Sequence, residues 1–107
     1  MADRFLRGKG FSIAAHNYRS KRGEIDLIAE KEGCLVFVEV KKWAGIPLSE
    51  AGYSVNAGKK RKIMNAAEKY VSENSKKYSN YQLRFDMVFI NDRNGEITHL
   101  ENVFEGA

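Results

Sequence analysis

A chain of 107 residues can bury one hydrophobic core but not two, so we expect a single domain over residues 1–107. Its 43% hydrophobic content excludes a disordered chain, its single cysteine excludes an internal disulfide, and no apolar run is long enough to span a membrane. The net charge of +4 is uneven, because residues 1–23 and 59–79 each carry +5 whereas residues 24–58 and 80–107 each carry −3.

The predicted elements follow the order α-β-β-β-α-β-β. A short helix over residues 3–9 ends at a Gly-Lys-Gly stop, and a longer helix over residues 59–78 has apolar residues at helical spacing. Residues 43–58 are rich in glycine and predict a loop, whereas Asn94-Gly95 predicts a hairpin turn. The predicted strands cover residues 11–18, 24–30, 35–42, 83–91 and 96–104. This order predicts an α/β sandwich with a mixed sheet.

The second and third predicted strands carry acidic side chains within apolar sequence. Glu39 follows a run of Val, Leu and Phe residues that is typical of a buried strand. Burying an unpaired carboxylate costs roughly several kcal/mol of free energy, so a partner must compensate its charge. The nearest candidates are Lys41, a metal ion, or both.

A two-residue turn at Glu32-Gly33 would set the register of these two strands. Asp26 would then lie opposite Glu39, with Cβ atoms about 4.5–5.5 Å apart. Because side chains alternate along a strand, Glu39 and Lys41 would share one face. By the same rule, Glu24 and Asp26 would share a face opposite to Ile25 and Leu27. The sequence therefore predicts carboxylates from two strands converging beside a lysine.

Such a group suits the hydrolysis of a phosphodiester. Asp26 and Glu39, supported by Glu24, are candidate ligands for Mg²⁺ or Mn²⁺, which polarises phosphate and lowers the pKa of bound water. Lys41 is the candidate for orienting that water or for stabilising developing charge. The alternative is a structural salt bridge in which Lys41 pairs with Glu39 or with Asp26.

Basic residues on both sides of the acidic centre are candidate contacts for nucleic-acid phosphates. Trp43 would share a face with Lys41 and could stack on an unpaired base, although packing is the usual role of a large aromatic residue. The alternative for the basic residues is ordinary solvated charge. Arg84 and Asp86 predict a structural ion pair. His16 and His99 have no partner pattern for a metal or a nucleophilic triad, so we expect surface or structural histidines. The candidate phosphate-binding residues are Arg19, Arg22, Lys59, Lys60, Arg61 and Lys62.

Four segments together resemble the YraN-like bacterial family, which is similar to small PD-(D/E)xK nucleases near the archaeal Holliday-junction resolvases. They are GEIDLI (23–28), VFVEVK (36–41), RFD (84–86) and ITHLENVF (97–104). The resemblance implies a restriction-endonuclease-like three-layer sandwich with a mixed central sheet. It also places Asp26, Glu39 and Lys41 at the metal-ligand and catalytic-lysine positions.

Three further residues, Asn17, Arg19 and Lys59, match positions that are typical of the family. Two features depart from the family pattern. Relatives usually carry a Gly-Glu pair whose glutamate would fall before Met1, and many have arginine at the position of Trp43.

The leading hypothesis is a cytoplasmic Mg²⁺-dependent nuclease acting on DNA, including branched or single-stranded DNA. The second is a nucleic-acid-binding module that keeps the fold without turnover, and the third is a protein-interaction domain. A homodimer would suit a resolvase, since two symmetric cuts need two sites.

Overall fold

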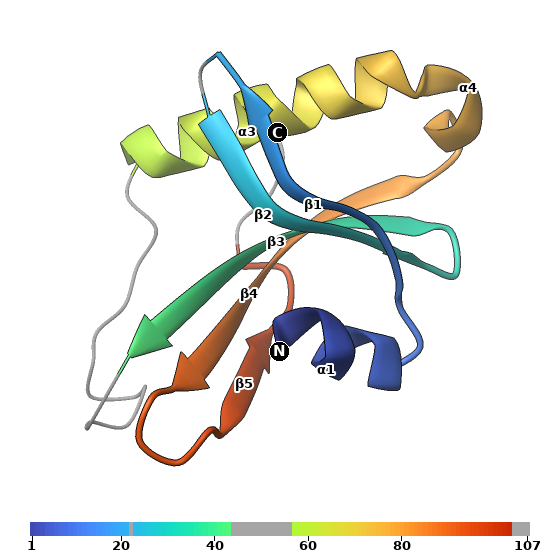
Figure 1. Ribbon diagram of the computed structural model, residues 1–107. Helices are drawn as coiled ribbons and strands as arrows, with labels where there is room; N and C mark the ends of the chain where they lie inside the picture. Colours follow the sequence, from blue (N-terminus) through green and yellow to red (C-terminus); the bar gives the residue numbers. More distant parts are fainter. Residues whose placement is uncertain (22, 44–56, 104–107) are drawn as a thin grey trace.

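The computed structural model describes residues 1–21, 23–43 and 57–103, and it is an α/β structure built around one five-stranded mixed sheet (Figure 1). Helix α1 covers one face of the sheet, and helices α3 and α4 lie against the other (Figure 1). No helix in the described ranges is both long and apolar enough to cross a membrane. The elements are α1 (Ala2–Gly8), β1 (Ser12–Ser20), β2 (Gly23–Lys31), β3 (Cys34–Trp43), α3 (Ala57–Glu73), α4 (Ser75–Tyr78), β4 (Gln82–Asn91) and β5 (Ile97–Leu100).

The strands lie in sequence order across the sheet, and the predicted order of elements is confirmed. Strands β1, β2 and β3 pair antiparallel, β3 and β4 pair parallel across the α3 connection, and β5 returns antiparallel to β4. The last strand is shorter than predicted. It ends before Asn102, which adopts a φ of 54°, and Val103 then donates a backbone hydrogen bond to Phe85.

Two other boundaries differ from the prediction. The predicted helix over residues 59–78 is divided at Asn74, whose ψ of 30° interrupts the helical backbone between α3 and α4. The predicted loop over residues 43–58 falls mainly on residues 44–56, which lie outside the described residues. Within the described part, Trp43 ends β3, and Ala57 and Gly58 open α3.

The sheet has a hydrophobic cluster on each face. On the α3 face, Ile63, Ala66 and Tyr70 of the helix pack on Ile28 and Phe37 of the sheet, which confirms the predicted apolar stripe. The α1-face cluster contains Ala2, Leu6, Phe11, Leu27, Ala29, Val36, Val38, Val88 and Ile90. Burial on both faces explains why β3 and β4 are apolar almost throughout.

The turn between β2 and β3 has the predicted two-residue form. Glu32 and Gly33 have φ angles of 50° and 77°, so both lie in the left-handed region that a type I′ turn requires. The ladder pairs Leu27 with Val38 and Ala29 with Val36, which is the register predicted from this turn. Asp26 and Glu39 are the next positions beyond the ladder.

The regular alternation of side chains fails at Asp26, and the prediction that Ile25 and Leu27 share a face is wrong. Ile25 packs in the α3-face cluster, whereas Leu27 packs in the α1-face cluster. The neighbouring β1 is also irregular here, because Asn17 adopts a left-handed φ of 48°. This local reversal brings the Asp26 carboxylate to the edge of both layers, where it borders pockets on both sides of the sheet.

Candidate functional site

A pocket of about 320 Å³ lies where β2, β3 and β4 meet the first turns of α3, and we call it the β2–α3 pocket. Three of the predicted acidic residues and two of the predicted basic residues line it. Its polar lining residues are Glu24, Asp26, Glu39, Lys59, Lys62 and Asp86, and its apolar ones are Ile25, Phe37, Val38, Ile63, Phe85 and Met87. The structure therefore brings the acidic centre and one of the basic segments together.

Asp26 and Glu39 reach this pocket from neighbouring strands. Asp26 Oδ2 accepts a hydrogen bond of 2.8 Å from the backbone N–H of Val40, so the carboxylate takes the place of a ladder partner where β2 and β3 separate. Glu39 lies on the same side of β3 as Phe37, facing α3. Asp26 and Glu39 thus both line one pocket.

The cation paired with Glu39 is Lys59, at the start of α3. The Glu39 side chain is 14% exposed and that of Lys59 is 41% exposed, so the ion pair lies at the rim of the pocket. Sequence reasoning named Lys41 or a metal ion as the partner and assigned Lys59 to phosphate. The lysine-rich first turn of α3, which contains no acidic residue, was interpreted as a phosphate site, whereas its first lysine pairs with Glu39.

Gly23 sets how closely α3 approaches the carboxylates. A Cβ atom built on Gly23 would lie 2.2 Å from the backbone oxygen of Lys62, far closer than non-bonded atoms allow. Only glycine at this position permits the contact between β2 and the first turns of the helix. Glycine in the GEIDLI segment therefore places Lys59 and Lys62 over Asp26 and Glu39.

The other predicted site residues lie outside the pocket lining or at its margin. Lys41 is exposed and follows Glu39 by two positions on β3, without lining the pocket. Arg19 is exposed, and its Nε atom lies 3.7 Å from the carboxylate of Glu24. Lys60 and Arg61 belong to the same helical turns as Lys59 and Lys62 but do not line the pocket. Arg22 and the side chain of Trp43 lie outside the described residues.

The donor set fits a dication that keeps most of its ligands from water or substrate. Within residues 1–21, 23–43 and 57–103, no group of three or more His, Cys, Asp or Glu residues is close enough to hold a metal ion. Mg²⁺ commonly binds through one or two carboxylates together with water and phosphate oxygens. Asp26 and Glu39 can supply this smaller set, whereas they do not form an all-protein cage.

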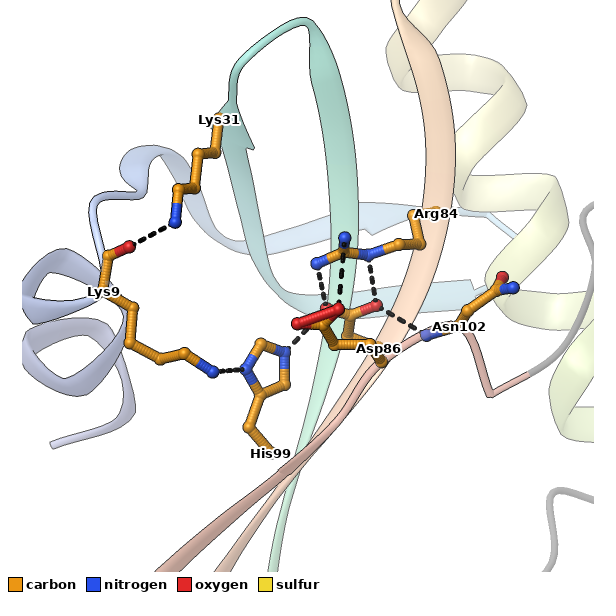
Figure 2. Close-up of polar contacts among 7 residues, drawn as sticks. Lys9, Lys31, Arg84, Asp86, His99 and Asn102 are labelled. Carbon is orange, nitrogen blue, oxygen red and sulfur yellow. Dashed lines mark hydrogen bonds and ion pairs between the residues drawn. The ribbon is translucent and has the colours of Figure 1, made fainter.

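A second polar cluster lies on the α1 side of the sheet, centred on Asp86, which is 2% exposed (Figure 2). Arg84 donates to both carboxylate oxygens, from Nε at 2.9 Å and from Nη2 at 2.8 Å. The hydrogen bonds to Asp86 hold the pKa of Arg84 above its usual value. The backbone N–H of Asn102 donates to the same carboxylate at 3.0 Å. The predicted ion pair of Arg84 and Asp86 is confirmed.

His99 completes this Asp86 cluster as a structural histidine, in agreement with one of the two roles expected for it. Its Nε2 atom lies 2.7 Å from Asp86 Oδ2, and its Nδ1 atom lies 2.7 Å from Lys9 Nζ (Figure 2). An ammonium only donates, so Nδ1 accepts from Lys9 and Nε2 carries the proton donated to Asp86. The apolar setting of Asp86 within β4 was the available signal, as it was for Glu39.

Comparison with known proteins identifies the family. The family model described as "Uncharacterised protein family UPF0102" matches residues 1–90. A UPF0102 protein of Saccharophagus degradans is 39% identical over 104 residues, covering 97% of this chain and 86% of the relative. Proteins of the same name from Desulfosudis oleivorans and Clostridioides difficile are 35% and 36% identical over 104 residues, covering 97% of this chain and 83% and 90% of the relatives. The family resemblance seen in the sequence is confirmed, and the chain belongs to the UPF0102 family.

Proposed function

We propose that this protein binds nucleic acid and hydrolyses DNA phosphodiesters with the help of Mg²⁺ or Mn²⁺. One observation carries the proposal: Asp26 and Glu39 line a single pocket together with Lys59 and Lys62. Carboxylates suit a hard dication, and lysines suit the phosphates of a nucleic-acid backbone. The resemblance to PD-(D/E)xK nucleases supports the same assignment.

Each residue has a role that follows from its position. Asp26 and Glu39 hold the dication, and Glu24 at the pocket margin adds negative charge. When bound, the dication polarises the phosphate and lowers the pKa of a bound water. Lys41 on the exposed end of β3 stabilises charge that develops on the phosphate oxygens. Lys60, Arg61 and Lys62 hold the backbone beside the pocket.

The test is a cleavage assay on linear duplex, single-stranded and four-way-junction DNA, with Mg²⁺, with Mn²⁺ and with a chelator. Glu39→Gln should remove metal-dependent cleavage, because the amide keeps the shape of the side chain and loses its charge. Glu68→Gln is the matched control, since Glu68 is exposed on α3 and does not line the β2–α3 pocket. Cleavage by Glu39→Gln at the wild-type rate would refute the assignment.

A second candidate is a nucleic-acid-binding module without turnover. It is favoured by the pairing of Glu39 with Lys59, which already neutralises one of the two proposed metal ligands. This alternative predicts salt-dependent DNA binding, no cleavage with any dication, and no loss of binding in Glu39→Gln. Measuring DNA affinity at several salt concentrations, in parallel with cleavage, separates the two candidates.

A further inference from the structure

We propose that Lys59 is an exchangeable counter-ion of the site: it neutralises Glu39 until a dication binds, and it is then released to a phosphate of the nucleic acid. This inference rests on the proposed function, because it concerns the same pocket. Lys59 would thus compensate the charge of Glu39 when no dication is bound, and would couple metal binding to DNA binding.

The first argument concerns the charge of Glu39. Its carboxylate is only 14% exposed and belongs to β3, a central strand with neighbours on both sides. A carboxylate in such a position needs a compensating charge to remain ionised. The Lys59 ammonium supplies that charge from α3, so it occupies the space beside Glu39 that a metal ion would require.

The second argument concerns how easily Lys59 can leave. Its side chain is 41% exposed, and a lysine ammonium is strongly hydrated and carried on a flexible stem. A partly exposed ion pair of this kind contributes little to stability, so water can readily replace it. A dication attracts the same carboxylate with twice the charge. The ion pair is therefore strong enough to compensate the charge of Glu39 and weak enough to be replaced by a dication.

The third argument concerns the difference between the two carboxylates. Asp26 is held by a backbone N–H, which stays in place when a metal ion arrives. Glu39 is held by a side chain, which can move. Only the Glu39 side of the pocket must exchange a partner, and the lysine that leaves stands on the same helix as Lys62, at the pocket rim.

Linkage follows from this exchange. A dication that releases Lys59 adds a free cation next to the backbone-binding lysines, so metal binding should raise the affinity for nucleic acid. By thermodynamic reciprocity, nucleic acid should raise the affinity for the dication by the same factor.

The decisive experiment is a titration of the DNA-free protein with Mn²⁺, which needs no catalytic turnover. Lys59→Met removes the competing charge and keeps the length of the side chain. We expect it to bind Mn²⁺ about two- to fivefold more tightly than wild type, the scale of a partly exposed ion pair. Lys69→Met removes the same charge from a similarly exposed, ion-paired lysine of α3 outside the pocket lining, and should bind Mn²⁺ as wild type does.

Two further variants guard against a trivial result. Lys59→Arg keeps the positive charge and should bind Mn²⁺ no more tightly than wild type, and thermal unfolding checks that all variants are folded. In a Glu39→Gln background, Lys59→Met should produce no gain in affinity, since no carboxylate remains for the lysine to mask. Lys59→Met that binds Mn²⁺ with wild-type affinity, more weakly or not at all overturns the inference.

A second measurement tests the release to phosphate. Adding Ca²⁺, used here instead of Mg²⁺, to the metal-free proteins should raise the DNA affinity of wild type more than that of Lys59→Met. An equal rise in both proteins contradicts the proposed release. The two proposals can fail separately. If Lys59→Met binds Mn²⁺ more tightly than wild type but the wild-type protein never cleaves DNA, the exchange is supported and the nuclease activity is refuted.

Discussion

Among the described residues, the carboxylate cluster around Asp86 and the carboxylates of the β2–α3 pocket differ in how completely protein groups satisfy them. Asp86 accepts hydrogen bonds from Arg84, His99 and the backbone of Asn102, and its side chain is fully enclosed. In the β2–α3 pocket, Asp26 accepts one hydrogen bond from Val40, and Glu39 is paired with a half-exposed lysine.

This difference separates a structural role from a binding role. A carboxylate whose oxygens are already occupied by fixed donors has no free coordination site, so the Asp86 cluster can join β4, β5 and the end of α1 although Asp86 also lines the β2–α3 pocket. A carboxylate beside a cavity that is held by a backbone donor, or paired with a flexible cation, can accept a new partner. The comparison predicts opposite responses when each carboxylate is changed to its amide.

The largest effect is expected for Asp86→Asn. The amide cannot accept from both nitrogens of Arg84 and from His99 together, so it leaves at least one of these donors without its partner. We expect the free energy of unfolding to fall by about 3 kcal/mol, as for a buried ion pair that loses one member. Urea denaturation measures this loss. Unchanged stability would show that the Asp86 cluster does not join these elements.

Gly23→Ala should have the next largest effect, and it should act on the pocket side. The added Cβ would lie 2.2 Å from the Lys62 carbonyl oxygen, so α3 must move away from β2. Overpacking of this kind is unfavourable by about 1–3 kcal/mol. Denaturation measures the change in stability, and Mn²⁺ titration should show altered affinity as Lys59 is displaced. Gly8→Ala is the matched control, because a Cβ atom there meets no atom within 4 Å. Gly33→Ala is unsuitable as a control, because Gly33 has a left-handed φ that alanine adopts only with strain.

Local sequence features predicted the register of the pocket well. The Glu32-Gly33 turn fixes which residues of β2 and β3 face each other, and a two-residue turn involves only neighbouring residues. The alternation of side chains then failed at Asp26. The neighbouring strand β1 is also irregular there, with the left-handed Asn17, and sequence patterns within β2 do not report on a residue of another strand. The two carboxylates nevertheless border one pocket, since the reversal leaves Asp26 at the edge of both layers.

The sequence did not predict which residues far apart along the chain pair with each other. Lys59 and Glu39 are 20 positions apart, and Lys9 and His99 are 90 positions apart, so no pattern along the chain connects them. Residue type did indicate that a partner exists, since a carboxylate in an apolar strand must be compensated. Which cation supplies the compensation depends on how α3 and α1 pack on the sheet, and that packing is set by contacts such as Gly23 with Lys62.

A smaller, pH-dependent effect is expected at the far end of α3, where the Tyr18 hydroxyl donates to Glu73 at 2.5 Å. Burial, followed by this hydrogen bond to a carboxylate, raises the pKa of Tyr18 from 10.0 to about 12. The folded state therefore retains its proton longer than the unfolded state, and this contribution to stability is present below pH 10 and is lost as the pH rises through about 12.

Tyr18→Phe should accordingly lower stability by about 1 kcal/mol at neutral pH and flatten the alkaline decline. Denaturation at a series of pH values from neutral upward measures both effects. Part of the decline should persist, because burial and hydrogen bonding also raise the pKa of Tyr78. A decline as steep as in wild type would show that Tyr18 is not the titrating group.

The smallest effect on stability is expected for Asp26→Asn, which is the direct counterpart of Asp86→Asn. An amide oxygen can still accept from the Val40 N–H, so the free energy of unfolding should change by less than about 1 kcal/mol. Loss of the negative charge should nevertheless weaken Mn²⁺ binding, measured by the same titration as for Lys59→Met. If Asp26→Asn were as destabilising as Asp86→Asn and left Mn²⁺ binding unchanged, both carboxylates would be structural. The same substitution on the two faces of the sheet thus tests whether free coordination capacity, rather than burial alone, distinguishes the binding cluster from the structural one.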